Sequence, residues 1–319
     1  MEIIKYLTSR LDYESPVVTI GNFDGVHLGH QKIFSRVVAR AEEISGTPIA
    51  VTFNPHPVRV LVPERGLKLI DTQEDKKALI ESMGIKVLIY INFDRDFAHM
   101  DSDVFIKNIL VDAIRSKWVI VGHSYSFGKG KKGTTSTLRA KGNKYSFKTQ
   151  VVRSVRVHGD VVSSSRIRSL VLWGRVCEVS RMLGRAYHIS GRVIKGAGRG
   201  DSLLSTPTAN IATANELMPK EGVYAVRVSL AFWPSSSEIY DGVANIGSNP
   251  TFDGKTVSCE VHIFDFNRNL TGEQLRLHFI DRIREEKKFA SVQELKEHID
   301  KDIIQAKKIL SARKDRLFL

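Results

Sequence analysis

The stretch VVTIGNFDGVHLGHQKIF, residues 17–34, decides the fold of the first half of the chain. It begins with a short apolar run typical of a buried strand, and a glycine-rich turn leads from that run into a helical pattern. Ligands of parallel sheets bind beyond the carboxyl ends of the strands, and a helix N-terminus there favours anions through its free N–H groups. His27 and His30 flank Gly29 in this turn, so both imidazoles can donate to one anion. The sequence therefore predicts a phosphate-binding turn, with a pair of hydrogen-bonded loop histidines as the plainer alternative.

The same alternation of strand and helix patterns continues to residue 122. Further strands are predicted at 47–53, 85–93 and 116–122, and helices at 31–46, 71–84 and 101–114. The first helix should bury one face made of Ile33, Val37, Ala41 and Ile44. Two more helices are expected at 163–174 and 178–185. Regular βα alternation predicts a parallel sheet covered by helices, in a first domain spanning residues 1–184.

The hydrophobic pattern of the second half differs from that of the first, which predicts a separate domain at 185–319. Short alternating strands are clearest at 224–230, 240–247, 257–264 and 274–280, and this pattern is typical of an antiparallel barrel or sandwich. A final helix is predicted at 291–310, where Ser291 and Glu294 form a capping box. Its apolar stripe should pack on the barrel and contains Val292, Leu295, Ile299, Ile303 and Ala306.

Composition excludes several classes of protein. With 42% hydrophobic and 26% charged residues and no apolar run of 18 residues, the chain is neither disordered nor membrane-spanning. No signal-peptide pattern opens it, so we expect a soluble protein in the cytoplasm, with no membrane partner. Cys177 and Cys259 are far apart and predict neither a disulfide framework nor a zinc site.

Positive charge is concentrated in one segment. Of a net charge of +13, residues 121–190 carry 14 Lys and Arg against 2 Asp and Glu, a local excess of 12. Within this segment, residues 128–144 mix cations with Gly, Ser and Thr and almost no aromatic residues. That composition suits a mobile loop contacting phosphates, and equally a solvated charged loop; an RNA-binding surface is a further alternative.

Three motifs of the first half occur together in a known family. HLGH at 27–30 resembles the HxGH motif of nucleotidyltransferases. The longer GNFDGVHLGH at 21–30, with TFNPHP at 52–57 and SSSRIR at 163–168, resembles the adenylyltransferase half of the bacterial bifunctional riboflavin kinase/FMN adenylyltransferase family. The resemblance implies a Rossmann-like nucleotidyltransferase domain in which His27, His30 and Arg168 act on the phosphates. It also implies that ATP or flavin is bound by Gly21, Phe23, Asp24, Gly29, Asn54, Ser164, Ser165 and Arg166.

One loop departs from the family's pattern. The family usually has GxDFxFGxxxxG, whereas this chain has GHSYSFGKGKKG at 122–133, with Ser124 and Tyr125 in place of the acidic and aromatic pair. The glycines at 122, 128 and 133 and Phe127 are retained. We therefore expect altered nucleotide contacts and an unchanged class of reaction.

Three motifs of the second half resemble the riboflavin kinase domain. They are GRVIKGAGRGDSLLSTPTANI at 191–211, GVANIGSNPTF at 242–252 and VSCEVHIFDF at 257–266. The resemblance implies that Thr208 and Asn210 hold Mg²⁺ and the ATP phosphates, and that Glu260 is the catalytic base. It also implies roles in substrate binding for Gly196, Gly200 and Asn249.

The residues around Glu260 give independent, weaker support. Val257, Cys259, Val261 and Ile263 alternate with Ser258, Glu260 and His262, so Glu260 lies on the polar face of a strand. A carboxylate there could accept the proton of an attacking hydroxyl, and a solvent-facing Glu would have the same pattern.

Two stretches depart from the pattern of the riboflavin kinase domain. Residues 203–210 read LLSTPTAN where the flap of the family usually ends in LGFPTAN, and NLTG at 269–272 stands where the family has a Tyr before the Gly.

Together the motifs predict a bifunctional enzyme of flavin-cofactor synthesis. It would phosphorylate riboflavin to FMN with ATP and then adenylylate FMN to FAD with release of pyrophosphate. ATP, riboflavin and FMN would be its small-molecule partners, Mg²⁺ its cofactor, and no nucleic acid is expected. Two alternatives stay open: an adenylyltransferase with a silent kinase domain, and an RNA-binding protein on a nucleotidyltransferase-like scaffold.

Overall fold

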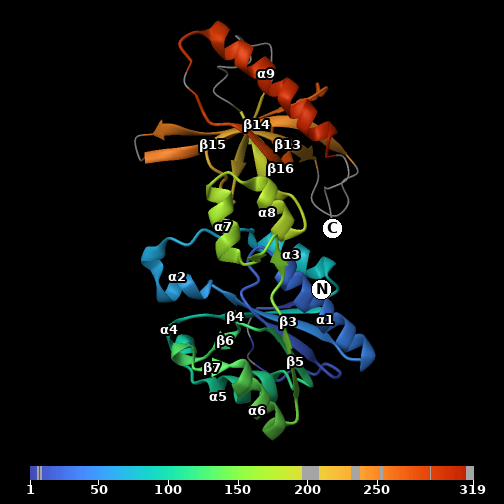
Figure 1. Cartoon of the computed structure of the whole chain (residues 1–319). Coiled ribbons are helices and arrows are strands. Elements are labelled where there is room, and N and C mark those ends of the chain that lie inside the picture. The colour runs from blue at the N-terminus through green and yellow to red at the C-terminus, as the bar shows by residue number, and fades with distance from the viewer. Residues whose placement is uncertain are drawn as a thin grey trace. The chain divides into compact units, whose positions relative to one another are not determined.

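The chain forms two compact units, Met1–Ser163 and Ser164–Leu319, and each is described by itself (Figure 1). A computed structural model describes residues 1–5, 7, 9–195, 208–230, 238–251, 254–287 and 289–313, without the side chains of 249–251 and 254–257. The second unit includes α7 (Ser164–Leu172) and α8 (Val176–Leu183), because α8 packs on strands of that unit. The predicted boundary after residue 184 follows these two helices and stays a prediction.

The first unit is built on a fully parallel sheet of six strands. Its order is β1-β4-β3-β2-β5-β8. The strands are β1 (Glu2–Ile4), β2 (Val17–Ile20), β3 (Pro48–Asn54), β4 (Val87–Asn92), β5 (Trp118–Gly122) and β8 (Lys148–Val152). The predicted parallel sheet is confirmed, and the sequence missed only the edge strands β1 and β8. Edge strands are often short or charged, which protects their unpaired side, and β1 and β8 have the sequences EII and KTQVV.

The strand order reverses at β2. The chain runs from β2 to β3 and β4 on one side, and it then returns to place β5 on the other side of β2. Such a reversal opens a crevice beyond the carboxyl ends of the two strands that flank it, where sheets of this class bind ligands. The turns that follow β2 and β5 are therefore the turns expected to hold a ligand.

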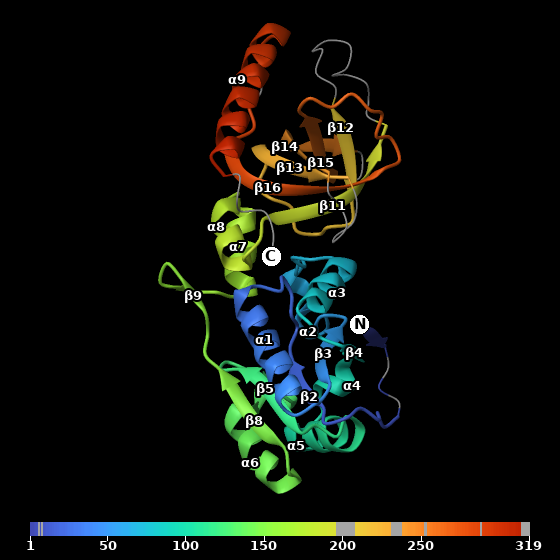
Figure 2. The same cartoon turned by 90° about the vertical axis from the view of Figure 1, so that its right-hand side faces the viewer.

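Helices cover both faces of the sheet (Figure 2). Val17, Ala50 and Leu88 face one core, which contains residues of α1 (Leu28–Glu43) and α3 (Gln73–Ser82). Val18, Ile49 and Ile89 face the other, which contains residues of three further helical segments. Those segments are α5 (Ser102–Phe105), its π-helical continuation Ile106–Ala113, and α6 (Thr135–Tyr145). Successive strand residues thus divide between two cores, as a two-sided parallel sheet requires.

Short elements connect these layers. The helical ones are α2 (Pro57–Leu61), α4 (Arg95–Ala98) and the 3₁₀ turns Pro63–Arg65 and Lys129–Lys131. The extended ones are the pairs β6 (Ser126–Phe127) with β7 (Gly133–Thr134), and β9 (Arg156–Val157) with β10 (Asp160–Val161).

The predicted inner face of α1 is confirmed and is wider than predicted. Val37 and Ala41 are buried, Ile33 and Ile44 are partly buried against the same core, and Phe34 and Gln31 complete the buried face. The Gln31 side chain is buried because its Nε2 donates to the backbone oxygen of Val26 at 2.9 Å. Ile44 is the C-cap residue of α1 and packs against this core partly buried.

The predicted loop at 128–144 is also wrong, because most of it is α6. Thr134 and Thr137 form a capping box in which each hydroxyl accepts the other residue's backbone N–H, at 3.3 and 3.2 Å. Leu138, on the inner side of α6, is fully buried and fixes the helix on the core. A Thr-x-x-Thr capping box was the signal in the sequence, but the surrounding lysines and glycines obscured it.

The second unit contains a closed barrel of six antiparallel strands, in the order β11-β12-β15-β14-β13-β16. The strands are β11 (Tyr187–Ile194), β12 (Ala209–Thr213), β13 (Gly222–Ser229), β14 (Ile239–Thr251), β15 (Gly254–Ile263) and β16 (Gln274–Arg284). The predicted barrel is confirmed, although β11 and β12 were not among the strands that the sequence marked clearly.

Helix α9 (Val292–Ser311) packs on the barrel through β13, β14 and β16 (Figure 1). Ser291 caps it as predicted, accepting the Glu294 N–H at 3.1 Å, whereas the Glu294 carboxylate accepts from Ala290 instead of closing the box on Ser291. Within the predicted apolar stripe, Ala306 is fully buried as expected. The inclusion of Val292 is wrong, because its side chain is exposed. No helix among the described residues is long and apolar enough to cross a lipid bilayer.

One ion pair fastens α9 to the barrel. Asp302 of α9 is buried, with 7% exposure. Its carboxylate accepts hydrogen bonds from Nε of Arg284 on β16 at 3.0 Å and from Nη2 of the same residue at 2.8 Å. This is a bidentate arrangement, in which both partners are fixed by geometry as well as charge.

We expect Asp302→Ala to lower the free energy of unfolding of the barrel by about 2–3 kcal/mol, because it leaves Arg284 partly buried without its counter-ion. Glu238→Ala is the control, since Glu238 forms an exposed ion pair with Arg268 and its loss should change stability by less than about 1 kcal/mol. Urea denaturation followed by circular dichroism measures both. Equal effects of the two substitutions would contradict this role of Asp302.

Candidate active sites

The turn that follows β2 is tied to the neighbouring strand. The Gly21 N–H donates to the Val51 oxygen at 3.0 Å, and the Thr52 hydroxyl donates to the Asn22 oxygen at 3.2 Å. Phe23 is buried beneath the turn, with its ring centroid 4.8 Å from that of Phe34. These contacts hold the turn at the carboxyl edge of the sheet. Phe23, predicted to contact substrate, is placed to support the turn from below.

His27 and His30 meet at the N-terminus of α1. His27 is the N-cap, and its Nδ1 accepts the backbone N–H of His30 at 3.3 Å. The two rings stack with centroids 3.6 Å apart and an interplanar angle of 16°. A Cβ at Gly29 would lie 3.1 Å from the His27 ring, so only glycine leaves the stack undisturbed. The predicted pairing of the two imidazoles at a helix start is therefore observed, and their role in binding phosphate remains a prediction.

A buried group of charges lies beside this pair. Asp24 is 4% exposed, and its Oδ1 accepts the Ile70 N–H at 3.0 Å. Lys76 of α3 is 7% exposed, with its Nζ 5.7 Å from the centroid of the Tyr90 ring. Burial lowers the pKa of Lys76, and the charges of Asp24 and Asp71 oppose that shift. The charges of these two carboxylates thus offset part of the electrostatic cost of burying the Lys76 ammonium.

Burial also lowers the pKa of His30 well below its ordinary value, and the charges of His27 and Lys76 lower it further. Lys76 is thus an electrostatic neighbour of the pair that the sequence analysis did not select. The feature of the sequence that could have identified Lys76 is its position four residues before Ile80, which places both residues on the inner face of α3.

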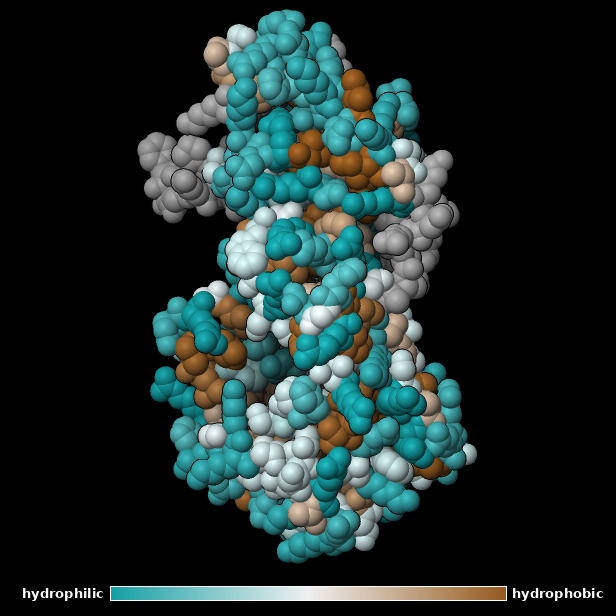
Figure 3. All heavy atoms as spheres, in the orientation of Figure 1, coloured by the Kyte–Doolittle hydropathy of each residue, from teal (hydrophilic) through white to brown (hydrophobic). Residues whose placement is uncertain are grey.

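Asn54 lies at the carboxyl end of β3, the edge of the sheet at which the histidine turn also lies. It is exposed, and Asn92 is its Cα partner on β4. The next residues lead into α2, whose N-cap is His56. Figure 3 shows hydrophobic side chains gathered over α2, where Leu61 is 55% exposed. The edge thus presents an amide and an apolar surface, which suits an amphipathic ligand.

The predicted phosphate-binding residues Ser164, Ser165, Arg166 and Arg168 lie at the start of α7. The Ser165 oxygen accepts from the Ser169 hydroxyl at 3.2 Å, and the Arg166 guanidinium lies 5.9 Å from the centroid of the Trp173 ring. These residues belong to the second unit, whereas the histidine turn belongs to the first. Their joint action on one phosphate remains a prediction.

The turn after β5 carries the departure from the family's pattern. Ser124 is exposed, and the Tyr125 ring stacks on Phe127 with centroids 5.4 Å apart. Burial strongly raises the pKa of Tyr125. Its hydroxyl has no hydrogen-bond partner within the described part of the chain. Gly128 has φ +70°, and a Cβ there would collide with the Ser102 backbone, so this glycine shapes the turn.

The second candidate site surrounds Glu260 on β15. The register places Asn210 of β12 and Asn245 of β14 opposite Glu260 on either side. Cys259, Val261 and Ile263 are buried, whereas Ser258, Glu260 and His262 are half-buried, so the predicted alternation is confirmed from residue 258 onward. Three polar side chains from three adjacent strands thus share one face of the sheet.

A cavity of about 300 Å³ opens at this face. Glu260, Asn245 and Thr208 contribute polar groups to it, and α9 and the segment before it form an apolar wall. The apolar residues of that wall include Phe289, Leu295 and Ile299, and the Arg284–Asp302 ion pair also lines the cavity. A largely apolar cavity with a few convergent polar groups is typical of a site for a small molecule.

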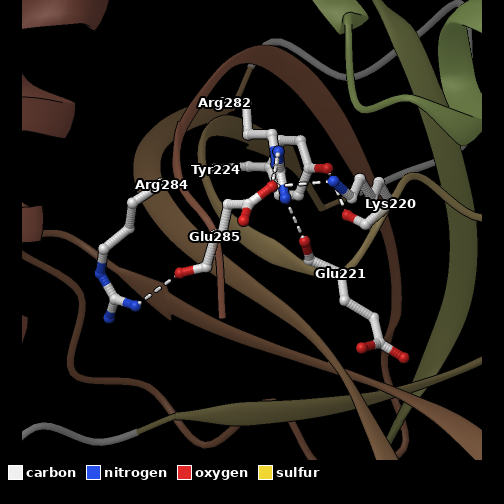
Figure 4. A network of polar contacts seen from close by, with 6 residues as sticks. All are labelled: Lys220, Glu221, Tyr224, Arg282, Arg284 and Glu285. Atoms are coloured by element: carbon white, nitrogen blue, oxygen red, sulfur yellow. Dashed lines mark hydrogen bonds and ion pairs between the residues drawn. The ribbon is translucent and has the colours of Figure 1, made fainter. Parts of the chain in front are cut away.

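A network of polar contacts fixes the segment that follows β16 (Figure 4). Glu285 accepts from Lys220 at 2.8 Å and from Arg282 at 3.4 Å, and its backbone oxygen accepts from Arg284 at 2.9 Å. The hydrogen bond from Lys220 lowers the pKa of Glu285. Burial raises the pKa of Tyr224, whose hydroxyl donates to the Lys220 backbone oxygen, to about 12. Both the side chain and the backbone of Glu285, where the wall of the cavity begins, are therefore held in place.

Some predicted residues lie outside what the structure describes. They are Gly196 and Gly200, and the side chain of Asn249, whose backbone is in β14.

The oxygen-bearing side chains around Glu260 provide only some of the ligands that a hard cation such as Mg²⁺ needs. Among the described residues, no group of three or more His, Cys, Asp or Glu side chains could hold a metal ion. Thr208 and Asn210 offer hydroxyl and amide oxygens beside the Glu260 carboxylate, and Mg²⁺ prefers oxygen ligands, several of them from substrate phosphates. The residues thus suit a magnesium ion that arrives with a nucleotide.

Two family models match this chain, one after the other. The model described as FAD synthetase matches residues 10–166, and the model described as riboflavin kinase matches residues 183–310. Together they cover the histidine turn and the Glu260 cavity, and the segment between them contains Arg168 and most of α7 and α8.

Curated relatives align over nearly the whole chain. Proteins named bifunctional riboflavin kinase/FMN adenylyltransferase are 36% identical in Haemophilus influenzae, over 91% of this chain and 92% of the relative, and 37% identical in Bacillus subtilis, over 90% of each. A solved structure titled macrolide-efflux protein from Streptococcus pneumoniae superimposes with a TM-score of 0.87 at 30% identity, covering 96% of this chain and 98% of that one.

We expect Tyr125→Phe to leave stability unchanged or to raise it by about 1 kcal/mol, because it removes a buried hydroxyl without a described partner. Tyr187→Phe is the matched control, since that hydroxyl donates to the Leu217 backbone oxygen and its loss should destabilise by about 1 kcal/mol. Scanning calorimetry of the two variants measures the difference. A clear destabilisation by Tyr125→Phe would mean that its hydroxyl is paired.

Proposed function

Because this chain belongs to the bifunctional riboflavin kinase/FMN adenylyltransferase family, we propose that its two candidate sites catalyse the two successive steps of flavin-cofactor synthesis. The protein is an ATP-dependent transferase that phosphorylates riboflavin to FMN and adenylylates FMN to FAD, releasing pyrophosphate. The observation that carries this assignment is that each family model coincides with one site: the histidine turn with the first, and the Glu260 cavity with the second.

We assign the kinase step to the barrel. Riboflavin would place its ring system against the apolar wall of the cavity, with its terminal hydroxyl directed to Glu260. The Glu260 carboxylate would accept the hydroxyl proton as the oxygen attacks the γ-phosphorus of ATP, and the bond to the β-phosphate oxygen breaks to release ADP. Half-burial supports this role, because Glu260 stays accessible to a substrate and is not paired with a cation at its neighbouring strand positions.

We assign adenylyl transfer to the turn at the start of α1. An oxygen of the FMN phosphate would attack the α-phosphorus of ATP, and the bond to the β-phosphate oxygen breaks as pyrophosphate leaves. No proton has to be removed from the nucleophile, so the site needs donors and not a base. His27 and His30 would donate to phosphate oxygens at the helix N-terminus, with Ser164, Ser165, Arg166 and Arg168 as further donors. Asn54 and the surface over α2 would contact the flavin.

This family generally uses a divalent metal ion, and we propose Mg²⁺ for this chain. Thr208 and Asn210 would hold it in the barrel, where it would neutralise phosphate charge. The comparisons give no support to a silent kinase domain or to an RNA-binding role, since the kinase model matches the second half and every named relative is bifunctional. A cytoplasmic location stays a prediction.

Incubating the protein with Mg²⁺ and ATP and either riboflavin or FMN tests the assignment, with the flavins separated by chromatography. The wild type should form FAD from both. Glu260→Gln should lower FMN formation from riboflavin by about 10²–10⁴-fold and leave FAD formation from FMN unchanged. His30→Gln should have the reverse effect, with FAD formation reduced by about 10²-fold or more.

Each variant controls for the folding of the other's unit. Loss of both activities in either variant would contradict the assignment of separate sites. Conversion of FMN alone by the wild type would mean that the altered flap sequence has silenced the kinase.

A further inference from the structure

The basic segment that stands out in the sequence has no part in the reaction as assigned so far. Residues 121–163 contain nine Lys and Arg and one acidic residue, whereas residues 1–120 contain 15 Lys and Arg and 16 Asp and Glu. The positive charge of the first unit is therefore confined to one segment. Exposed charges of one sign produce a potential that attracts counter-charged ligands over the Debye length of the solution.

The fold divides these charges between the two edges of the parallel sheet. β5 ends at Gly122, so the turn that follows it begins at the carboxyl edge, and this turn carries three lysines: Lys129, Lys131 and Lys132. The chain returns through α6 to the amino edge, where β8 begins and its first N–H donates to the Lys117 oxygen at 2.9 Å. Three other lysines belong to that edge: Lys117, Lys144 and Lys148. The same number of lysines thus lies at the ligand-binding edge and at the opposite edge.

The turn after β5 begins beside the histidine turn. β5 and β2 are neighbours in the sheet, with Val18 aligned with Val119, so both turns leave the same edge from adjacent strands. A Cβ at Gly122 would lie 3.5 Å from Cδ1 of Ile33, on the helix that His27 caps. The lysine-bearing turn therefore starts against the first turns of α1.

Backbone hydrogen bonds fix the base of this turn, and its lysine side chains are exposed. The Lys129 N–H donates to the oxygen of Met100, in the connection that follows β4, at 2.9 Å. The Lys131 N–H donates to the Gly128 oxygen at 3.0 Å, and β6 and β7 pair on either side of the turn. The ammonium groups are thus attached to a fixed backbone at the carboxyl edge and extend into water.

Few acidic groups oppose these lysines. The segment that packs against the turn carries Asp101 and Asp103, and Asp103 forms an ion pair with Lys141 of α6. In the described part of the chain, no ion pair engages any of the three lysines of the turn. Positive charge is therefore in excess here.

We propose that Lys129, Lys131 and Lys132 form an electrostatic funnel that draws the anionic substrates of adenylyl transfer, ATP and FMN, toward the histidine turn without contacting the reacting phosphates. This rests on the function proposed above. Exposed ammonium groups on long flexible stems are strongly hydrated point charges, so they raise the local concentration of phosphates and do not orient them. Such attraction acts at a distance, and dissolved salt weakens it.

The KM for ATP in FAD formation from FMN, measured against KCl concentration, tests this. In the triple variant Lys129→Gln, Lys131→Gln, Lys132→Gln, we expect KM to rise about 10-fold at an ionic strength of about 0.01 M, with kcat unchanged. At about 1 M, where the Debye length is about 3 Å, the KM values of this variant and the wild type should converge.

The matched control is the triple variant Lys117→Gln, Lys144→Gln, Lys148→Gln, which removes the same charge from the amino edge. Its KM should stay within about 3-fold of the wild type at low ionic strength. Equal rises in the two variants would overturn the proposal, because net charge and not position would then explain them. A rise that persists at about 1 M would also overturn it, since that indicates direct contact with phosphate.

If the carboxyl-edge variant fails to fold, the wild type still decides. Its KM for ATP in FAD formation should rise between ionic strengths of about 0.01 M and about 1 M, and a constant value would overturn the proposal.

Calorimetric titration with inorganic pyrophosphate, without flavin, measures the same attraction independently of turnover. At low ionic strength the carboxyl-edge variant should bind pyrophosphate about 10-fold more weakly than the wild type, and the amino-edge variant should bind like the wild type. Equal affinities in all three proteins would overturn the inference. Failure of the wild type to convert FMN, with the difference in affinity retained, would overturn the proposed function and support the funnel for another phosphate ligand.

Discussion

The reversal of strand order at β2 is the constraint on which the first unit depends. Parallel strands need long connections, and these place β3 on one side of β2 and β5 on the other. The turns after β2 and β5 therefore diverge at the carboxyl edge of the sheet, where the N-terminus of α1 points its free N–H groups at the opening. The His27–His30 stack uses one of these N–H groups for its own cap, so the position of the imidazoles is a direct result of where the helix begins.

The barrel positions its site by closure of the sheet and by the register of its strands. Closure pairs every strand, and alternation then sends apolar side chains to one face and polar ones to the other. Glu260 is aligned with Asn210 and Asn245 by backbone register alone. The wall opposite this face comes from α9 and the preceding segment, which the Arg284–Asp302 pair and the contacts of Glu285 fix in position (Figure 4). A rigid register and a separately anchored helix together enclose the cavity.

Both units bury charge beside their sites. Arg284 meets Asp302 across two elements of the barrel, and Lys76 is buried on α3, where the charges of Asp24 and Asp71 oppose the lowering of its pKa by burial. A buried ion pair contributes little net stability, because desolvation offsets the attraction. What such a pair provides is a defined position for both partners.

The sequence by itself determined the alternation of βα units, the change to a barrel, the histidine turn and the strand face of Glu260, because periodicity and glycine-rich turns are local properties of the chain. It did not identify α6 in the basic segment, where a capping box and one buried leucine outweighed the glycines, nor the edge strands, which have no continuous apolar run. The family resemblance supplied the choice of site residues, but it gave no reason to select Lys76. Only the tertiary structure decided that Lys76 is buried and that Asp24 of the histidine turn accepts from Ile70, 46 residues later, because this contact arises from packing the segment before α3 against the turn, and no local pattern records it.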